Sequence, residues 1–318
     1  MTADSPKTGA PGASTSSSAS AGASGAASIG ASGAAPSATI LSSETTDNIT
    51  LRISDEGIAY VLLDRPEKLN ALTIPMLKRM IQVSRQIQKD KSIRAVILTG
   101  ANGNFSSGLD FGAAFKSPRE IAANFASRPW RGTNTFQEGP WCWRRLDVPV
   151  IAAVPGYCFG GGLQIALASD YRFTSADAAW SVLEAKWGLV PDMSGVQALK
   201  QVVGADVAKR LSMGAEIITG AQAVKYGLAS EVAEDPLAAA EELARVFIDR
   251  SPDAVAQSKK LIDETWTAGP RKTFFLERLR QAPLLFGQNA KVAKARAAAA
   301  KVGKKLPGYK PRRSRHVF

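Results

Sequence analysis

The chain alternates short apolar runs with longer segments that carry apolar residues at helical spacing. Residues 49–53 alternate apolar and polar side chains, residues 58–63 form an apolar run, and the acidic turn between them ends in glycine, which predicts a β-hairpin. Residues 74–87 predict a helix with Thr73 as its N-cap, and residues 95–98 predict a short buried strand. Strand, helix and strand in this order favour parallel pairing through a right-handed crossover.

The same alternation returns further along the chain. A strand at residues 148–154, a helix at 163–168 and a strand at 171–174 repeat the order, and this repetition indicates an α/β fold. Residues 116–145 are rich in Pro, Gly, Arg and Trp, and we interpret them as a long active-site flap with helical pieces. The alternative is that its aromatic residues only pack a connection. Four later segments predict helices, at residues 206–213, 221–226, 237–248 and 253–264.

Composition divides the chain into four parts. Residues 1–45 are almost wholly Ala, Ser, Gly, Thr and Pro, which predicts a disordered tail. We expect an α/β core at residues 46–255, a C-terminal helical region at 256–300 and a basic tail at 301–318. The N-terminal tail lacks the apolar stretch of a secretory signal and the arginines of a transit peptide, and no segment is apolar enough to span a membrane. We therefore expect a cytoplasmic protein.

Its positive charge is concentrated near the C-terminus. The net charge is +12, and residues 289–318 contain Lys and Arg but no Asp or Glu. Such an end can contact nucleic acid, anionic lipid or ligand phosphates, but a solvated tail is the commoner outcome and the one we expect. The basic residues are Lys291, Lys294, Arg296, Lys301, Lys304, Lys305, Lys310, Arg312, Arg313 and Arg315.

A glycine triple follows the apolar strand at residues 148–154. Gly160, Gly161 and Gly162 lie between Pro155 and the helix that is predicted to begin near Leu163. Glycines let the backbone approach a ligand closely, and the first amides of a helix have no acceptor within the helix. An oxyanion site is one interpretation of this turn. A tight strand-to-helix turn without a ligand is the other.

Five motifs together favour the first interpretation, because in this order they resemble the crotonase superfamily of enoyl-CoA hydratases and isomerases. The resemblance covers residues 49–259 and implies a crotonase-like spiral of β-β-α units with a C-terminal helical region. It also implies trimers or hexamers, and it makes residues 256–300 a helical cap over the site or an oligomerisation region. The motifs are RPEKLNAL (65–72), AVILTG (95–100), FSSGLD (105–110), DVPVIAAVPGYCFGGG (147–162) and ITGAQAVKYGLASEV (218–232).

The resemblance implies a site that stabilises an enolate of a coenzyme A thioester. Its oxyanion hole would be the backbone amides of Leu109 and Gly161. Hydratases of the family carry two glutamates that share the attacking water. The second is retained as Glu184, but the first position holds Gln164, which is no general base. We expect Glu184 to transfer the proton and Gln164 to orient water or a carbonyl by hydrogen bonds, the alternative for Glu184 being a solvated loop residue.

Asp192 lies eight residues after Glu184, where hydratases usually have glycine and dienoyl-CoA isomerases place a catalytic aspartate. Those isomerases also have a carboxylate at the Gln164 position, so this chain matches neither pattern fully. A catalytic role for Asp192 and a structural role in capping its loop both remain open.

The coenzyme end of the substrate is assigned by the same resemblance. It implies binding of the nucleotide and phosphates by Arg65, Lys68, Asn70, Ala71, Gly108 and Asp110, with Lys68 alternatively only solvated. We expect the CoA thioester as substrate, no permanently bound cofactor and no metal site. Cys142 and Cys158 have no metal-ligand spacing, and the only histidine, His316, lies in the tail, which disfavours a histidine triad. An acyl-CoA-binding or RNA-binding homologue without hydratase activity is the alternative function.

Overall fold

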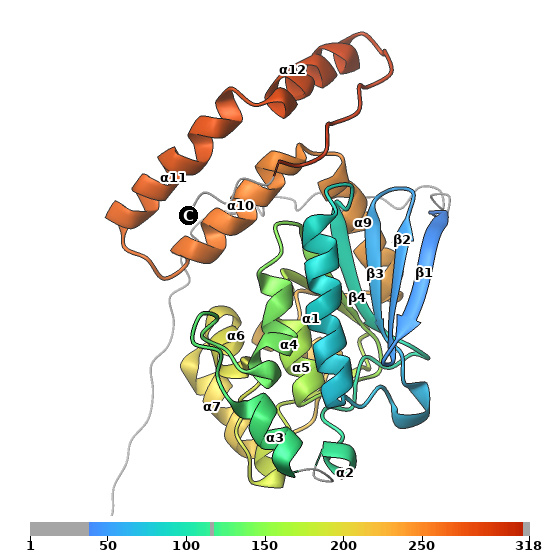
Figure 1. The fold of residues 1–318 in the computed structure, drawn as a ribbon, viewed down its shortest axis with the longest axis vertical. Coiled ribbons are helices and arrows are strands. Elements are labelled where there is room, and N and C mark those ends of the chain that lie inside the picture. Colours follow the sequence, from blue (N-terminus) through green and yellow to red (C-terminus); the bar gives the residue numbers. More distant parts are fainter. Residues whose placement is uncertain (1–37, 115–117, 314–318) are drawn as a thin grey trace, which may run out of the picture. The chain divides into compact units, whose positions relative to one another are not determined.

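The strands form one large sheet and one small sheet (Figure 1). The computed structural model describes residues 38–114 and 118–313. In these residues the strands are β1 (Ile40–Thr46), β2 (Ile49–Ser54), β3 (Ile58–Leu63), β4 (Ala95–Gly100), β5 (Val150–Val154), β6 (Tyr157–Phe159), β7 (Tyr171–Thr174), β8 (Ala179–Ser181), β9 (Ile218–Thr219) and β10 (Glu231–Val232). The large sheet has the order β1-β2-β3-β4-β5-β7-β10 and the small one β6-β8-β9.

Helices cover both faces of the large sheet. Figure 1 shows α1 in front of the strands and α9 behind them. The helices in the described residues are η1 (Pro66–Lys68), α1 (Ile74–Lys89), α2 (Phe111–Ala114), α3 (Pro118–Phe125), α4 (Thr135–Arg144), α5 (Gly161–Leu167), η2 (Glu184–Trp187), α6 (Gly195–Val202), α7 (Ala205–Gly214), α8 (Gly220–Tyr226), α9 (Pro236–Ile248), α10 (Pro252–Thr265), α11 (Pro270–Leu285) and α12 (Gln288–Lys301).

The expected spiral of β-β-α units is confirmed. Strand β5 enters the large sheet, β6 the small sheet, and α5 follows; β7 and β8 repeat the step before η2 and α6. The predicted hairpin is β2 and β3, and β3 pairs in parallel with β4 after the chain passes through α1. Thr73 caps α1, since its Oγ1 accepts a hydrogen bond from the Met76 amide at 3.3 Å.

Burial on both faces explains why the central strands are continuously apolar. In β4, Val96 and Leu98 join the core on the α1 side, whereas Ala95 and Ile97 join the core on the α9 side. Successive side chains of a strand point to opposite faces, so a parallel strand between two helical layers needs apolar residues throughout.

Residues 40–45, which we expected to belong to the disordered tail, lie in β1 and pair with β2. All seven β1 residues are exposed, so backbone pairing orders the strand without apolar burial. The turn between the strands is Asp47-Asn48, and both residues have positive φ (50° and 56°). That combination is typical of a two-residue type I′ hairpin turn, a signal that the composition of the tail concealed. Residues 1–37 lie outside the described residues.

The boundary that we expected at residue 255, between the α/β core and the C-terminal helical region, also differs from the structure. It falls inside α10, which begins at Pro252 with Ser251 as its N-cap and runs to Thr265. The helical pattern therefore crosses the boundary that the resemblance suggested. The described residues from Ala38 onward form a single compact unit.

The basic end was expected to be a solvated tail, but in the described residues it folds back onto the core. Arg312 is 3% exposed, and its guanidinium donates to the carbonyls of Ile87, Gln88 and Asp90 at 3.0–3.2 Å, at the C-terminal end of α1. Burial lowers the pKa of Arg312. The carbonyls at the end of a helix receive no hydrogen bond from amides of that helix. A cation at this place also interacts favourably with the negative end of the helix dipole. Arg312 is therefore unavailable to a nucleic acid.

Two further contacts fasten this segment. The Asn289 side chain exchanges hydrogen bonds with the backbone N–H and C=O of Lys310, at 2.9 and 3.1 Å. Asp253 accepts from the Arg313 amide at 2.8 Å. We call residues 304–313 the C-terminal strap, because they join α12, α10 and α1. Residues 314–318, which include Arg315 and His316, lie outside the described residues.

Arg312→Ala should lower the melting temperature, because it removes buried charged hydrogen bonds to three carbonyls. Hydrogen bonds to charged groups contribute about 1.5–3 kcal/mol, and each kcal/mol shifts the melting temperature of a large domain by about 2–4 °C. Lys305→Ala is the matched control, since Lys305 is an exposed cation of the same strap. Equal melting temperatures of the two variants by calorimetry would show that the strap does not stabilise the core.

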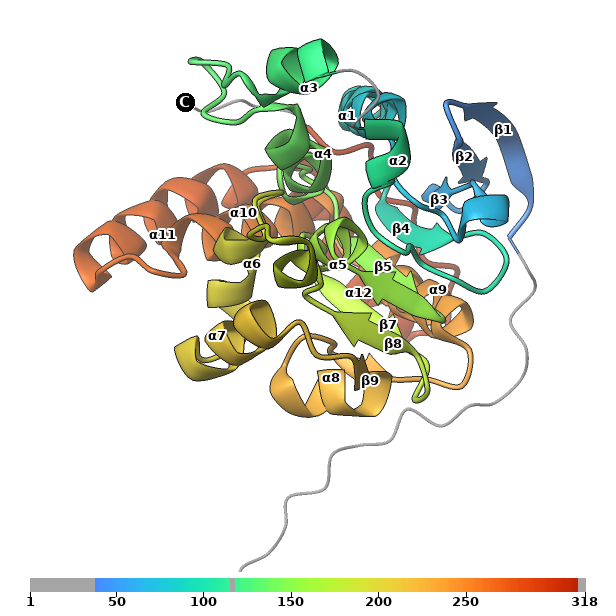
Figure 2. The same cartoon turned by 90° about the horizontal axis from the view of Figure 1, so that it is seen from below.

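Helix α11 leaves apolar side chains exposed. It packs along α10, and Figures 1 and 2 both show that it lies away from the strands of the sheet. Phe275 and Leu285 are 56% and 60% exposed, and Phe286, directly after the helix, is 86% exposed. None of the helices in residues 38–114 and 118–313 combines the length and the apolar character needed to cross a membrane.

Candidate active site

The FSSGLD loop lies between two other segments that fix its path. Ser106 pairs with β6, since its amide donates to Tyr157 O at 2.8 Å and its carbonyl accepts from Phe159 N at 3.0 Å. On the other side Leu109 forms a bridge with Leu72. Gly108 has φ +96°, and a Cβ there would lie 3.0 Å from Phe159 O, so only glycine fits without strain. The loop is thereby held against the start of α5.

This packing places the two expected oxyanion-hole residues on one cavity. Leu109 and Gly161 both line a cavity of about 120 Å³, together with Gly108, Gly160 and Glu184. Among the described residues, neither the Leu109 amide nor the Gly161 amide donates to a protein acceptor. Two unpaired amides at a small cavity can hold the oxygen of a thioester as it gains negative charge.

Glu184 faces this cavity from η2. Its side chain is 8% exposed, and Oε1 accepts a hydrogen bond from Gln164 Nε2 at 2.5 Å. Its Oε2 is buried and has no partner among the described residues. Burial raises the pKa of Glu184 above its ordinary value and the negative charge of Asp192 raises it further, while hydrogen bonds lower it. The alternative of a solvated loop glutamate is therefore wrong, and the raised pKa makes the carboxylate a stronger base.

Gln164 does not line the cavity. It is 1% exposed, and its amide lies between Glu184 and α6, where its Oε1 accepts from the Gly195 amide at 2.8 Å. The nitrogen and the oxygen of the side-chain amide are therefore both hydrogen-bonded within the protein. The structure places Gln164 behind Glu184, where it orients that carboxylate, and not at the position of a group that meets substrate.

Asp192 lines the mouth of the cavity, in the loop before α6. Partial desolvation raises the pKa of its carboxyl group. The residue caps no helix, since Ser194 is the residue before α6 and its side chain makes no capping hydrogen bond. A hydrogen bond from its own backbone lowers the pKa of the Asp192 carboxyl, so a role in its loop stays open beside a catalytic one, and a second carboxylate lies at the cavity.

Most of the expected coenzyme-binding residues hold their own turn together. Arg65 pairs with Asp110 at 2.8 Å and also donates to the carbonyl of Ala71 at 3.2 Å. Asn70 is fully buried, accepts from the Arg65 amide at 2.9 Å and donates to Ala101 O and Asn104 O at 2.9 and 2.7 Å. Its side chain is thus satisfied within the protein, which favours a structural role for it in this turn.

Lys68 keeps an exposed side chain at this turn, while its carbonyl accepts from the Ala71 amide. Lys68→Ala should weaken binding of a CoA thioester by about 0.5–1 kcal/mol if one exposed phosphate contact is lost. Binding of the matching pantetheine thioester, which lacks the nucleotide, should not change. Calorimetric titration of both ligands checks this, and equal weakening would show that Lys68 acts through the fold.

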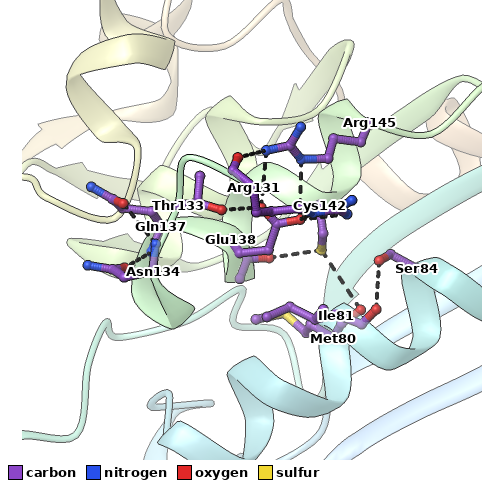
Figure 3. A network of polar contacts seen from close by, with 11 residues as sticks. Met80, Ile81, Ser84, Arg131, Thr133, Asn134, Gln137, Glu138, Cys142 and Arg145 are labelled. Carbon is purple, nitrogen blue, oxygen red and sulfur yellow. Dashed lines mark hydrogen bonds and ion pairs between the residues drawn. The ribbon is translucent and has the colours of Figure 1, made fainter. Parts of the chain in front are cut away.

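The expected flap contains two helices but does not line the cavity within its described residues, Pro118 to Arg145. A buried carboxylate organises its second half, as Figure 3 shows. Glu138 is fully buried and accepts from Thr133 Oγ1 at 2.6 Å, from Arg131 at 2.9 Å and from Arg145 at 3.2 Å. Trp143 is fully buried while Trp130 is 83% exposed, so the tryptophans of this segment do not act together.

Sequence reasoning missed the apolar side of the cavity. Phe111 and Trp187 face each other with ring centroids 5.3 Å apart, and both line the cavity with Leu183, Leu189 and Met193. Phe111 follows FSSGLD directly and Trp187 follows Glu184 by three residues. These positions beside the motifs could have predicted that both side chains lie at the cavity. These side chains would contact the acyl part of a bound thioester.

Comparison with known proteins agrees with this geometry. The family described as enoyl-CoA hydratase/isomerase matches residues 54–291. A short-chain-enoyl-CoA hydratase of Clostridium acetobutylicum is 35% identical over 218 residues, which cover 66% of this chain and 80% of that protein. A mitochondrial Delta(3,5)-Delta(2,4)-dienoyl-CoA isomerase of Mus musculus is 30% identical over 227 residues, 69% of each chain.

A solved structure supports the fold. The enoyl-CoA hydratase from Polaromonas sp. JS666 superimposes with a TM-score of 0.71 at 27% identity, over 82% of this chain and 99% of that one. The shared fold, the two free amides and the matched family together show that this chain belongs to the enoyl-CoA hydratase/isomerase family of the crotonase superfamily.

Proposed function

We propose that the protein moves the double bond of an unsaturated acyl-CoA thioester by proton transfer, with Glu184 as the base. The observation that carries this proposal is the set of residues that line the cavity. Leu109 and Gly161, whose amides are unpaired, line the same cavity as Glu184, whose Oε2 has no partner among the described residues, and Asp192 is the second carboxylate there. The position of the first hydratase glutamate is occupied by Gln164, whose amide is used within the protein.

The residues act on a 3-enoyl thioester as follows. The thioester oxygen accepts hydrogen bonds from the amides of Leu109 and Gly161. Glu184 removes a proton from C2, and the electrons of that C–H bond delocalise over the C3=C4 double bond and the thioester oxygen. The protonated Glu184 then returns the proton to C4, which leaves the double bond between C2 and C3. No water is consumed, so one carboxylate suffices.

Asp192 supports this role through its charge. The negative charge of Asp192 disfavours ionisation of Glu184, which raises the pKa of Glu184 beyond the effect of burial alone. A base whose pKa lies closer to the working pH takes up a proton from carbon more readily. The rate should therefore rise with pH through the raised pKa of Glu184, since the ionised form is the base.

Hydration is the second candidate, and the 35% identity to a short-chain-enoyl-CoA hydratase favours it. Water addition needs a second group that activates water. In this chain the group in the cavity would be Asp192, because Gln164 does not line it. We prefer isomerisation because Gln164 replaces the first of the two glutamates that hydratases of the family use to activate water.

A panel of 2-enoyl, 3-enoyl and 3,5-dienoyl CoA thioesters tests the proposal. The purified protein should interconvert the positional isomers faster than it forms any 3-hydroxyacyl product. Tight binding of every thioester without turnover would instead identify an acyl-CoA-binding homologue and contradict the proposed reaction.

We also propose that the protein works as a homotrimer or hexamer and binds no permanent cofactor. The exposed apolar residues of α11 support assembly, because side chains such as Phe275 and Leu285 are usually covered in a stable protein. Light scattering should give a mass of three or six chains. A monomeric mass would contradict this part of the proposal.

A further inference from the structure

We propose that Gln164 is a positioning residue that holds both cavity carboxylates, Glu184 directly and Asp192 through the loop before α6. This inference rests on the proposed function and adds a residue that acts without touching substrate. It is carried by two hydrogen bonds that leave opposite ends of one buried amide.

The surroundings of Gln164 allow only one orientation of its amide. Nε2 donates to Glu184 Oε1 at 2.5 Å, and Oε1 accepts from the Gly195 backbone amide at 2.8 Å. An ionised carboxylate can only accept and a backbone N–H can only donate, so exchanging the oxygen and nitrogen of the amide would break both bonds. Gln164 lies one helical turn after Gly161 in α5, so the same helix also supplies an oxyanion-hole amide.

The bond to Glu184 selects which oxygen meets the substrate. Oε1 is occupied by the amide, and Oε2 is left without a partner among the described residues. A neutral donor also suits this place better than a second carboxyl would, because two carboxyls at this separation would share one proton. Gln164 therefore leaves Glu184 with one oxygen that has no partner among the described residues.

The bond to Gly195 fixes the loop that carries Asp192. Ser194 has a left-handed backbone (φ 67°), which is unusual for a residue other than glycine, and its side chain does not cap α6. The Gly195 amide, at the first position of α6, is satisfied by Gln164 instead. Asp192 lies three residues before this anchor, so losing the anchor would free the loop and its carboxylate together.

Gln164→Leu and Gln164→Met test the role, since neither side chain can form the two hydrogen bonds and methionine keeps the length of the glutamine. The expected result is a fall in kcat for isomerisation of about 100-fold, typical of a displaced catalytic group, with little change in KM. The acid limb of the kcat–pH profile should move to higher pH, because the donor that lowers the pKa of Glu184 is gone while burial still raises it.

Gln88→Leu is the matched control. Gln88 makes the same kind of bridge, donating to Asp147 Oδ2 at 2.6 Å and accepting from the Asp147 amide at 3.1 Å, at the far end of α1 from the cavity. This variant should keep the wild-type kcat and pH profile even if its melting temperature falls. Equal losses of kcat in the Gln88 and Gln164 variants would show that the loss comes from lower stability of the fold, and would overturn the inference.

The result also separates this inference from the proposed function. An active wild type whose kcat and pH profile are retained in both Gln164 variants would overturn the positioning role alone. A wild type that isomerises no thioester would overturn the proposed function, and the positioning role with it.

Discussion

Glu184→Gln should lower the exchange of the C2 proton of a 3-enoyl-CoA by about 10²- to 10⁴-fold, the range that general base catalysis contributes. The amide keeps the size of the side chain but cannot take up a proton at working pH. Oxyanion-hole amides and cavity shape remain, so binding of the thioester should be nearly unchanged. Proton exchange with solvent deuterium, followed by NMR, measures the loss at the reacting carbon itself.

Glu241→Gln is the control for that experiment. Glu241 is a carboxylate of α9, on the opposite side of the sheet from α1, where it accepts from Tyr60 Oη at 2.9 Å and pairs with Arg245. The same change of charge there should leave exchange unaffected. If Glu184→Gln exchanged the proton as fast as the wild type, the base would have to be another group, with Asp192 the first to examine.

Gly161→Pro should lower kcat by about 10²- to 10³-fold, because proline removes the amide hydrogen from one of the two oxyanion donors. Gly161 is the first residue of α5, a position at which proline is compatible with a helix. The loss corresponds to about 3 kcal/mol of transition-state stabilisation. Turnover of a 3-enoyl-CoA at saturating substrate measures it.

Gly161→Ala separates the amide from the added side chain. A Cβ at this position would lie 2.9 Å from Met193 Sδ and 3.1 Å from Leu72 Cδ1, so both variants meet the same flexible side chains. Only the proline variant lacks the N–H. Equal losses in the two variants would assign the effect to crowding, and the Gly161 amide would then not be a donor to the thioester.

The positions of Leu109 and Gly161 at one cavity were predictable because short motifs specify them. Gly108 and the glycine triple occupy places where a Cβ would meet a neighbouring backbone or side chain, so the fold restricts the residue type there. Glu184 was placed by its motif in the same way. The orientation of Gln164 was not predictable, because it depends on Gly195, which lies 31 residues away in the chain.

The roles of the Asn70 and Arg312 side chains could not be read from the sequence, for one shared reason. An asparagine in a turn and an arginine in a charged run both appear available for ligands, but burial against distant segments decides their role. Asn70 is saturated by Ala101 and Asn104, and Arg312 contacts Ile87, 225 residues earlier. Apolar periodicity predicted the central strands and helices well, since burial of their own side chains determines them.

Double-bond migration in a 3-enoyl-CoA tests the central claim most directly. The wild-type protein is mixed with the thioester, and proton NMR follows the vinyl signals and the appearance of any 3-hydroxyacyl signal in the same sample. We predict that the double bond moves to C2=C3 faster than water adds, and that Glu184→Gln abolishes the migration. Hydration of the 2-enoyl thioester without any migration from the 3-enoyl thioester would contradict the account.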